Sequence, residues 1–280
     1  MLKQRILTAL VLLAVLLPAL FYPSFVPLAV LTLVLIAAGC WEWGRLNGLA
    51  QGPALALGAL GALLCATSWW AGWILAAPPW LWTLAGAAWV VLGGWLLARG
   101  VGRWQEVARG LRLLGGLLAL WLAWLAMARA RALGINFLLS LLCLVWAADI
   151  FAYFAGRTFG RRKLAPAISP GKSWEGVFGG MAGVLVLALL WAWADTHWQA
   201  SVPSLYSVLA ARGPLWWLPA LLFLAVMSVV GDLVESLVKR SAGAKDSSGL
   251  LPGHGGVLDR IDALLPTLPL ALMITEFAQA

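Results

Sequence analysis

The sequence predicts an all-α, polytopic integral membrane protein with about nine transmembrane helices. Of its 280 residues, 63% are hydrophobic and 11% are charged, whereas soluble domains carry about 25% charged residues. The hydrophobic residues form long runs, and one helix needs about 20 apolar residues to cross the hydrocarbon core of a bilayer. These observations exclude a soluble globule, and the high hydrophobicity with little charge also excludes a disordered chain.

Nine apolar runs, separated by charged or Pro- and Gly-rich stretches, are the candidate spans. They lie near residues 5–22, 26–44, 54–77, 80–98, 109–128, 134–156, 176–194, 215–238 and 263–279. The first run has the outline of a signal peptide, but no small-x-small cleavage site precedes Pro18, so we expect an uncleaved helix. We expect turns or kinks in the segments around Pro23, Pro27 and Pro78-Pro79.

Lys and Arg residues are distributed unequally between alternate loops. If the amino terminus is cytoplasmic, 16 of the 19 lie on the cytoplasmic side, and those opposite are Arg129, Arg131 and Arg212. Because positive charge collects on the cytoplasmic side of membrane proteins, we expect this orientation in the cytoplasmic (inner) membrane, with the carboxyl terminus outside. The net charge of +8 then serves orientation and contact with anionic lipid, so we expect no nucleic acid partner.

The chain divides by chemistry into residues 1–133 and 134–280. The first part holds only two of the 11 acidic residues, Glu42 and Glu106, together with many tryptophans. Such aromatic residues form interface belts or helix contacts, so this part is interpreted as a transmembrane scaffold. Seven of the other nine acidic residues fall at or near the cytoplasmic side, and we expect the function there.

The densest charge lies in residues 231–262, which contain five carboxylates, four Lys or Arg residues and one of the two histidines. Charges are costly near a bilayer, so such a cluster indicates a functional site. Asp232, Glu235 and Ser236 are spaced i, i+3 and i+4, which places three oxygen ligands on one helical face. Asp259 and Asp262 repeat the three-residue spacing. A plain solvated loop would not need these spacings.

These residue types suit phosphate chemistry. Carboxylate oxygens favour Mg²⁺, which shares its remaining positions with substrate phosphates. The glycine-rich segment 249–256 allows positive φ and close approach to an anion, and it places His254 inside the cluster. The basic residues that would face the same phosphates are Lys239, Arg240, Lys245 and Arg260. Together these are the parts expected of phosphoryl or nucleotidyl transfer.

A second basic segment, residues 169–173, precedes the seventh span. Its Gly171-Lys172-Ser173 triplet is not a P-loop, because the Walker pattern needs a glycine where this chain has Pro166. We expect Ser169 and Pro170 to start a helix with Glu175 in its first turn and free N–H groups that meet phosphate. Helix capping would explain Ser169 but not Lys172, which favours a substrate role for this segment.

Asp149 lies near the cytoplasmic third of an apolar span. It could simply bond a neighbouring helix, but acids inside a membrane more often belong to a site, so we include it among the site residues. The basic run that follows, Arg161 to Lys163, is interpreted as serving orientation and attraction to anionic lipid.

The motifs agree with a known family. The order Ser236-x-x-Lys239-Arg240, then Lys245-Asp246, then Pro252-Gly-His-Gly-Gly256, then Asp259-Arg260-x-Asp262 resembles the signature of the bacterial phosphatidate cytidylyltransferase family, also called CDP-diacylglycerol synthases. Asp149-x-x-Ala-Tyr153-Phe-x-Gly-Arg157 and Ser169 to Gly176 resemble two further family segments, with Ser173 where members often have Thr. The resemblance covers about residues 145–265, whereas residues 1–133 match only in being hydrophobic and helical.

The resemblance implies Mg²⁺-dependent transfer of CMP from CTP to phosphatidic acid, giving CDP-diacylglycerol and pyrophosphate in phospholipid biosynthesis at the cytoplasmic face. The resemblance also implies that residues 134–280 form the catalytic transmembrane region, with active-site loops on the cytoplasmic side. It suggests a homodimer, and it leaves open whether a second, monovalent cation is needed. The expected catalytic residues are Asp232, Lys239, Arg240, Lys245, Asp246, His254, Asp259 and Arg260. The expected substrate-binding residues are Asp149, Tyr153, Arg157, Ser169, Lys172, Ser173, Glu175 and Ser236. The expected metal ligands are Asp232, Glu235, Asp246, Asp259 and Asp262.

Two alternatives stay open at this point. A CTP-dependent lipid kinase would use a similar cluster to transfer the γ-phosphoryl group to a lipid alcohol. A transporter or channel for an anionic solute would line a pathway with Asp149 and the basic loops, although its charges would be expected at the midplane rather than at one surface.

Overall fold

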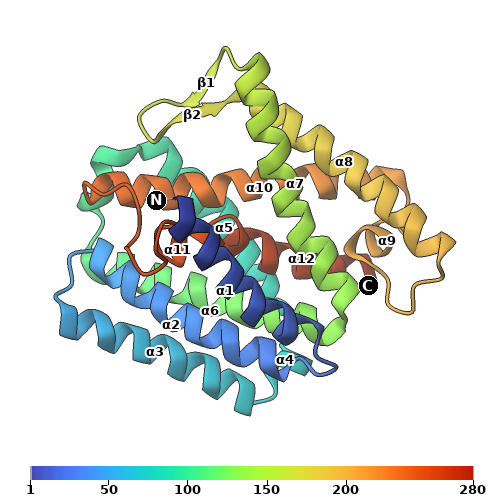
Figure 1. Cartoon of the computed structure of the whole chain (residues 1–280), viewed down its shortest axis with the longest axis horizontal. Helices are drawn as coiled ribbons and strands as arrows, with labels where there is room; N and C mark the ends of the chain where they lie inside the picture. The colour runs from blue at the N-terminus through green and yellow to red at the C-terminus, as the bar shows by residue number, and fades with distance from the viewer. Residues whose placement is uncertain (1, 280) are drawn as a thin grey trace.

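The structure is a computed structural model that describes the backbone of residues 2–279 and the side chains of residues 6–278. It is a bundle of long helices from which one short hairpin projects (Figure 1). The first elements are α1 (Leu2–Phe21), α2 (Val26–Leu46), α3 (Gln51–Trp70), α4 (Trp73–Ala76), α5 (Pro79–Arg99), the 3-10 helix η1 (Val101–Glu106) and α6 (Arg109–Leu133). The remaining elements are α7 (Ile135–Phe159), β1 (Lys163–Ala165), β2 (Ser169–Ser173), α8 (Trp174–His197), α9 (Leu205–Ala210), α10 (Pro214–Ser241), α11 (Leu258–Ile261) and α12 (Leu264–Gln279).

Within the described residues, eight helical segments are long and apolar enough to cross a membrane. They are α2, α3, α5, α6, α7, α8, α10 and the segment Leu258–Ala278, and α1 adds a shorter apolar stretch, Ile6–Phe21. The prediction of an all-α protein with about nine spans is thereby confirmed. Lys3 and Arg5, which the orientation prediction counts, lie outside the residues whose side chains are described.

The third predicted span is interrupted near its end. α3 ends at Trp70, Gly72 has a φ of 78°, and α4 begins at Trp73. Glycine adopts this left-handed conformation without steric cost, so the helix stops there. Pro27 and Pro79 lie in the first turns of α2 and α5, where the missing N–H has no helical partner to lose. These prolines therefore mark helix starts rather than kinks.

Glycines allow α7 and α8 to pack closely against each other. A Cβ at Gly180 of α8 would lie 2.7 Å from the carbonyl oxygen of Ala148 in α7, and one at Gly176 would lie 2.9 Å from that of Ala152. Small residues at this spacing let membrane helices approach each other's backbones. The pairing of α7 with α8 fixes the position of the hairpin, which connects their adjacent ends (Figure 1).

The expectation that Ser169 and Pro170 start a helix is wrong. Residues Ser169–Ser173 form β2, which pairs antiparallel with β1, and α8 begins only at Trp174. The Ser173 hydroxyl accepts a hydrogen bond from the Gly176 N–H (3.2 Å) and so caps the helix. A serine cap satisfies a free helical N–H, and a hairpin edge tolerates a proline that lacks one.

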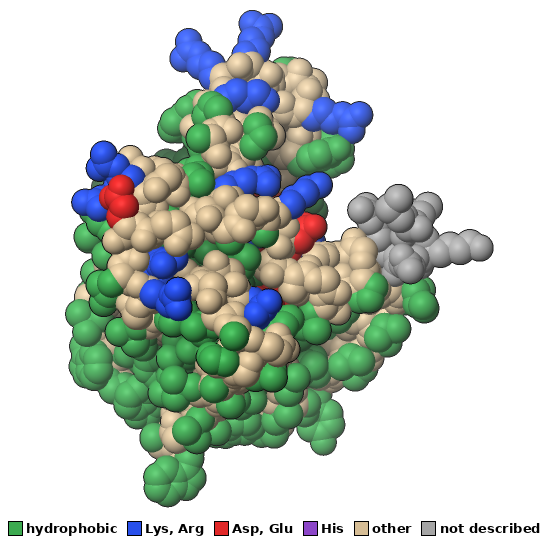
Figure 2. Space-filling model, turned by 90° about the vertical axis from the view of Figure 1, so that its left-hand side faces the viewer, with side chains coloured by type: hydrophobic (Ala, Val, Ile, Leu, Met, Phe, Trp, Pro, Cys, Tyr) green, Lys and Arg blue, Asp and Glu red, His purple; other side chains and the backbone are tan. Residues whose placement is uncertain are grey.

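Charge is distributed unevenly over the surface. On the face shown in Figure 2, Lys and Arg side chains gather over the projecting upper part and a band below it, and hydrophobic side chains cover most of the lower part. The hairpin occupies the same upper position in Figure 1. The charged end of the bundle is therefore distinct from the apolar surface that a bilayer would cover.

Candidate active site

An ion-pair cluster lies near the carboxyl-terminal end of α10. The Lys239 ammonium lies 2.5 Å from a carboxylate oxygen of Glu235, one turn earlier, and 2.5 Å from a carboxylate oxygen of Asp259 in α11. The exposed fractions of the Lys239, Glu235 and Asp259 side chains are 13%, 2% and 6%. One lysine therefore contacts two nearly buried carboxylates at once, and leaving either of them without a cation would be costly.

The other oxygen of Asp259 holds the loop between α10 and α11. It accepts hydrogen bonds from the Ser247 N–H (2.8 Å), the Ser247 hydroxyl (2.8 Å) and the Gly256 N–H (2.7 Å). In the same loop Gly253 and Gly255 have positive φ, in line with the conformations that glycine permits. Asp259 thus shapes the glycine-rich loop, and both of its carboxylate oxygens have protein partners.

Asp232 connects α10 to the hairpin. One of its oxygens lies 2.6 Å from the Lys172 ammonium in β2, and the other accepts a hydrogen bond from the Ser236 hydroxyl (3.2 Å). The Lys172 and Asp232 side chains are 24% and 27% exposed, so this pair is more accessible than the Lys239 cluster. Two motifs that are separate in the sequence meet here.

Two further carboxylates lie near Asp232, those of Asp149 in α7 and of Asp262. The three are close enough to repel one another electrostatically. Gly231 allows this approach, because a Cβ there would overlap the carbonyl oxygen of Asp262 and lie 2.8 Å from the Pro266 ring. The carboxyl-terminal halves of α7 and α10 and the start of the last span thus converge on one concentration of negative charge.

No set of three His, Cys, Asp or Glu side chains is arranged to hold a metal ion within the described part of the chain. Asp232 and Asp262 nevertheless offer the oxygen atoms that Mg²⁺ prefers. Mg²⁺ commonly takes one or two carboxylates and completes its shell with water and substrate phosphates. The donor set therefore fits Mg²⁺ that is bound together with a phosphate substrate.

Four predicted residues lie on the exposed rim of the cluster, namely Arg240, Lys245, Asp246 and Arg260. Arg240 and Arg260 donate to backbone carbonyls, at 3.5 and 3.1 Å, and none of the three cations forms an ion pair with a described residue. His254 lies in the glycine-rich loop, and its Nδ1 atom is buried with no hydrogen-bond partner among the described residues. The rim therefore presents cations that are free to meet an anion.

Tyr153 and Arg157 continue the face of α7 that begins at Asp149, because the three are spaced four residues apart. The Arg157 guanidinium donates to the Tyr153 hydroxyl (2.9 Å), and both side chains are exposed. Ser169, the first residue of β2, is partly buried. These residues extend the polar surface from the carboxylates toward the hairpin.

Glu175 lies against the hairpin rather than toward the carboxylates. Its carboxylate accepts hydrogen bonds from the backbone N–H groups of Arg161 (3.1 Å) and Arg162 (3.2 Å). The side chains of Arg161, Arg162 and Lys163 are exposed. Glu175 thus holds the start of the hairpin, and Ser173 caps the helix that follows it.

Glu42, which lies in α2 and is completely buried, was not among the site residues predicted from the sequence. Its carboxylate accepts hydrogen bonds from the N–H groups of Val257 (2.9 Å) and Leu258 (2.8 Å) and from the hydroxyl of Ser248 (2.5 Å). The Ser247 hydroxyl lies 3.2 Å away. Glu42 lies near the end of an apolar run. Acids inside a membrane more often belong to a site, as was noted for Asp149, and this applies equally to Glu42.

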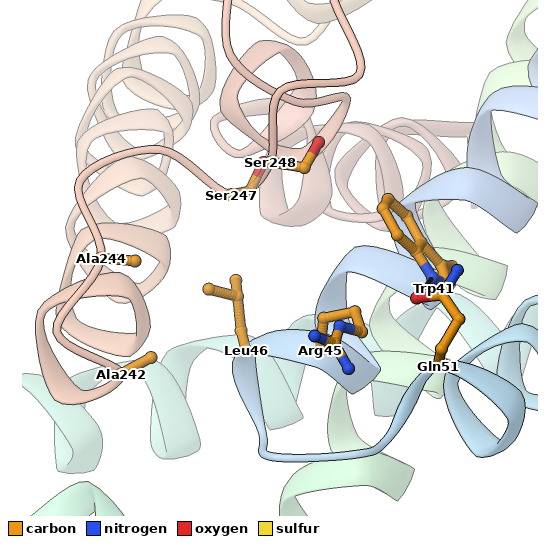
Figure 3. Close-up of a pocket in the computed structure, with 8 residues that line it drawn as sticks. All are labelled: Trp41, Arg45, Leu46, Gln51, Ala242, Ala244, Ser247 and Ser248. Carbon is orange, nitrogen blue, oxygen red and sulfur yellow. Dashed lines mark hydrogen bonds between the residues drawn. The ribbon is translucent and has the colours of Figure 1, made fainter.

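A cavity of about 410 Å³ opens beside this loop (Figure 3). Its walls are the end of α2, the start of α3 and the segment that follows α10, with the residues Trp41, Arg45, Leu46, Gln51, Ala242, Ala244, Ser247 and Ser248. Ser247 also bonds Asp259, so the cavity reaches one wall of the ion-pair cluster.

The fold and this site define a polytopic helical membrane protein whose charged residues converge at one end of the bundle around a glycine-rich loop. The chain belongs to the cytidylyltransferase family, a family of nucleotidyl-transferring enzymes, since residues 3–278 match the model of that family. It is 39% identical, over 278 residues, to the phosphatidate cytidylyltransferase of Pseudomonas aeruginosa, covering 96% of this chain and 95% of the relative.

Other relatives match about half of the chain. The phosphatidate cytidylyltransferase of Haemophilus influenzae is 48% identical over 136 residues, covering 49% of this chain and 44% of the relative. That of Bacillus subtilis is 40% identical over 136 residues, covering 49% and 46%. The resemblance expected from the motifs is thus confirmed at the level of the family.

Proposed function

We propose that the chain transfers CMP from CTP to phosphatidic acid and releases CDP-diacylglycerol and pyrophosphate. The observation that carries this proposal is the 39% identity to the Pseudomonas aeruginosa phosphatidate cytidylyltransferase over 96% of the chain. In this reaction an oxygen of the lipid phosphate attacks the α-phosphorus of CTP, and the bond from that phosphorus to the β-phosphate oxygen breaks. All groups involved are anionic, which suits a site bordered by Lys172, Lys245 and Arg260.

The site needs no strong general base for this reaction, because the lipid phosphate is already an anionic nucleophile. Charge neutralisation and in-line placement are the main requirements. Lys172 exchanges Asp232 for a substrate phosphate, which the partial exposure of their ion pair supports. Arg240, Lys245 and Arg260 bind the triphosphate from the exposed rim. Lys239 keeps Glu235 and Asp259 in place.

Asp232 and Asp262 would hold Mg²⁺, with Asp149 close by, and the bound ion would offset negative charge on the triphosphate. Asp232 becomes available when Lys172 moves to a phosphate. Glu235 and Asp259 are already paired with Lys239, and Asp246 is exposed near the rim. These three predicted ligands would therefore bind the metal only if the ion pairs opened and the loop rearranged.

The enzyme works at the cytoplasmic face of the cytoplasmic membrane. A charged end at the membrane surface lets the acyl chains of phosphatidic acid remain in lipid while CTP arrives from water. The unequal distribution of Lys and Arg between alternate loops supports this orientation. Reaction of intact inverted and right-side-out vesicles with external CTP distinguishes the two orientations, and the proposal requires activity in the inverted vesicles.

The decisive experiment uses purified protein in detergent–lipid micelles with phosphatidic acid and CTP that carries separate labels on its α- and γ-phosphates. The proposal requires the α-label in CDP-diacylglycerol, an equal amount of pyrophosphate, and no product when Mg²⁺ is absent. Transfer of the γ-label to an added lipid alcohol would instead establish a lipid kinase. If folded protein transfers neither label, the proposal fails, and transport of an anionic solute becomes the hypothesis to test.

A further inference from the structure

We infer that Glu42 is a positioning residue, which holds the glycine-rich loop so that Asp259 and Lys239 keep their arrangement. Glu42 belongs to the amino-terminal part of the chain, more than 200 positions before the residues that it contacts. The inference rests on the proposed function for its effect on turnover, while its effect on the loop can be measured without any activity.

The first observation is the number of contacts that one buried carboxylate makes to one loop. The Glu42 Oε1 atom accepts from the Ser248 hydroxyl and the Val257 N–H, and Oε2 accepts from the Leu258 N–H. These donors lie at both ends of segment 248–258. A carboxylate offers about four acceptor positions without a donor of its own, so it can hold both ends at once. An amide has only one acceptor oxygen, and a shorter acid on the same backbone position reaches these donors only in part.

The second observation is a direct link to the ion-pair cluster. The Ser247 hydroxyl lies 3.2 Å from Glu42 Oε2 and 2.8 Å from Asp259 Oδ2. The hydroxyl has one proton, which it can donate to only one of the two carboxylates at a time. Whichever carboxylate accepts that proton, the hydroxyl oxygen lies between the two. Glu42, Ser247, Asp259 and Lys239 therefore form a continuous polar chain from α2 to α10.

The third observation is independent of these hydrogen bonds. A Cβ at Gly256 would overlap both the Glu42 carboxylate and the Ser247 hydroxyl. The loop backbone thus approaches the carboxylate so closely that only glycine fits at this position. A substitution at Gly256 should separate Glu42 from the loop without changing either polar partner.

The end of α2, which carries Glu42, is held in place by its neighbours. Its neighbour Trp43 donates its indole N–H to the Arg112 carbonyl (2.9 Å), and Asn47 accepts from the Trp104 indole (3.2 Å). These buried contacts fix the end of α2 against α6 and η1. A carboxylate on a fixed helix end can impose its position on the loop segments that donate to it.

The test compares Glu42→Gln, Glu42→Asp and Gly256→Ala with the matched control Glu106→Gln, an exposed acid of the same part of the chain. Hydrogen exchange of residues 246–260 is measured in wild type and variants. We expect this segment to exchange about tenfold faster or more in all three variants, because hydrogen bonds to Val257 and Leu258 weaken. We expect α12 and the control to keep the wild-type rates.

Turnover gives the second readout. We expect kcat to fall about 10–100-fold in Glu42→Gln with little change in KM for CTP or phosphatidic acid, and we expect Glu42→Asp to recover part of it. Unchanged exchange of residues 246–260, or faster exchange spread equally over all helices, would overturn the inference. If Glu42→Gln does not fold, Ser248→Ala removes one donor and must give a smaller effect on the same segment. If the wild type makes no CDP-diacylglycerol, the proposed function fails while the exchange result still decides the role of Glu42.

Discussion

The Lys172 ammonium lies 2.6 Å from the Asp232 carboxylate, although the two residues are 60 positions apart in the sequence. This pair connects the hairpin to α10 and brings a basic motif and an acidic motif into one site. Because both side chains are about one quarter exposed, the pair can open toward a substrate at little cost in folding stability.

Lys172→Met should therefore reduce activity far more than stability. An exposed ion pair contributes about 1 kcal/mol or less to folding, and removal of one partner of a buried pair costs about 3–5 kcal/mol. This pair is partly exposed, so we expect a moderate fall in the unfolding temperature and a much stronger loss of kcat/KM. Lys163→Met changes an exposed lysine on the neighbouring strand; it is the control and should retain activity. Equal losses of activity in both variants would indicate a general effect of hairpin charge instead.

Lys239→Met should behave in the opposite way and destabilise the fold. It leaves the nearly buried carboxylates of Glu235 and Asp259 without a cation, and removing one partner of a buried ion pair costs about 3–5 kcal/mol. Chemical denaturation in detergent measures this loss. The double variant Lys239→Met with Glu235→Gln should recover part of it, whereas a wild-type midpoint for Lys239→Met would contradict the buried-pair description.

Gly231→Ala should separate α10 from the start of the last span. The added methyl group would overlap the carbonyl of Asp262 and contact Pro266, so we expect lower stability and a loss of turnover from the displacement of Asp232. Gly94→Ala in α5 is the matched control, because a Cβ there meets nothing within 4 Å. It should be neutral or stabilise the helix by up to about 1 kcal/mol. Thermal unfolding and turnover, measured for both variants, test this prediction.

Removal of divalent cations with a chelator should abolish turnover, and Mg²⁺ should restore it. Asp232→Asn and Asp262→Asn should raise the Mg²⁺ concentration for half-maximal activity by about tenfold or more. Glu106→Gln serves as the control with the wild-type requirement. A normal Mg²⁺ requirement in both aspartate variants would move the metal to other residues.

The sequence predicted the class of fold and the polar segments well, because both depend on local patterns. Apolar runs of span length placed nearly all long helices, and the spacing of Asp232, Glu235 and Ser236 placed them on one helical face, where Ser236 bonds Asp232. The helix start at Ser169 was wrong, since two plausible caps lie four residues apart and only strand pairing with β1 selects Ser173.

The sequence by itself determined that the chain is a helical membrane protein of the cytidylyltransferase family, because hydropathy and motif spacing are properties of short segments. The tertiary structure decided which charges meet. Lys239 pairs with Glu235 and Asp259, Lys172 pairs with Asp232, and Glu42 anchors the loop from α2. Such partners are brought together by helix packing, which depends on close contacts such as that of Gly231 with Asp262, and packing between distant segments leaves no periodic signal in the sequence.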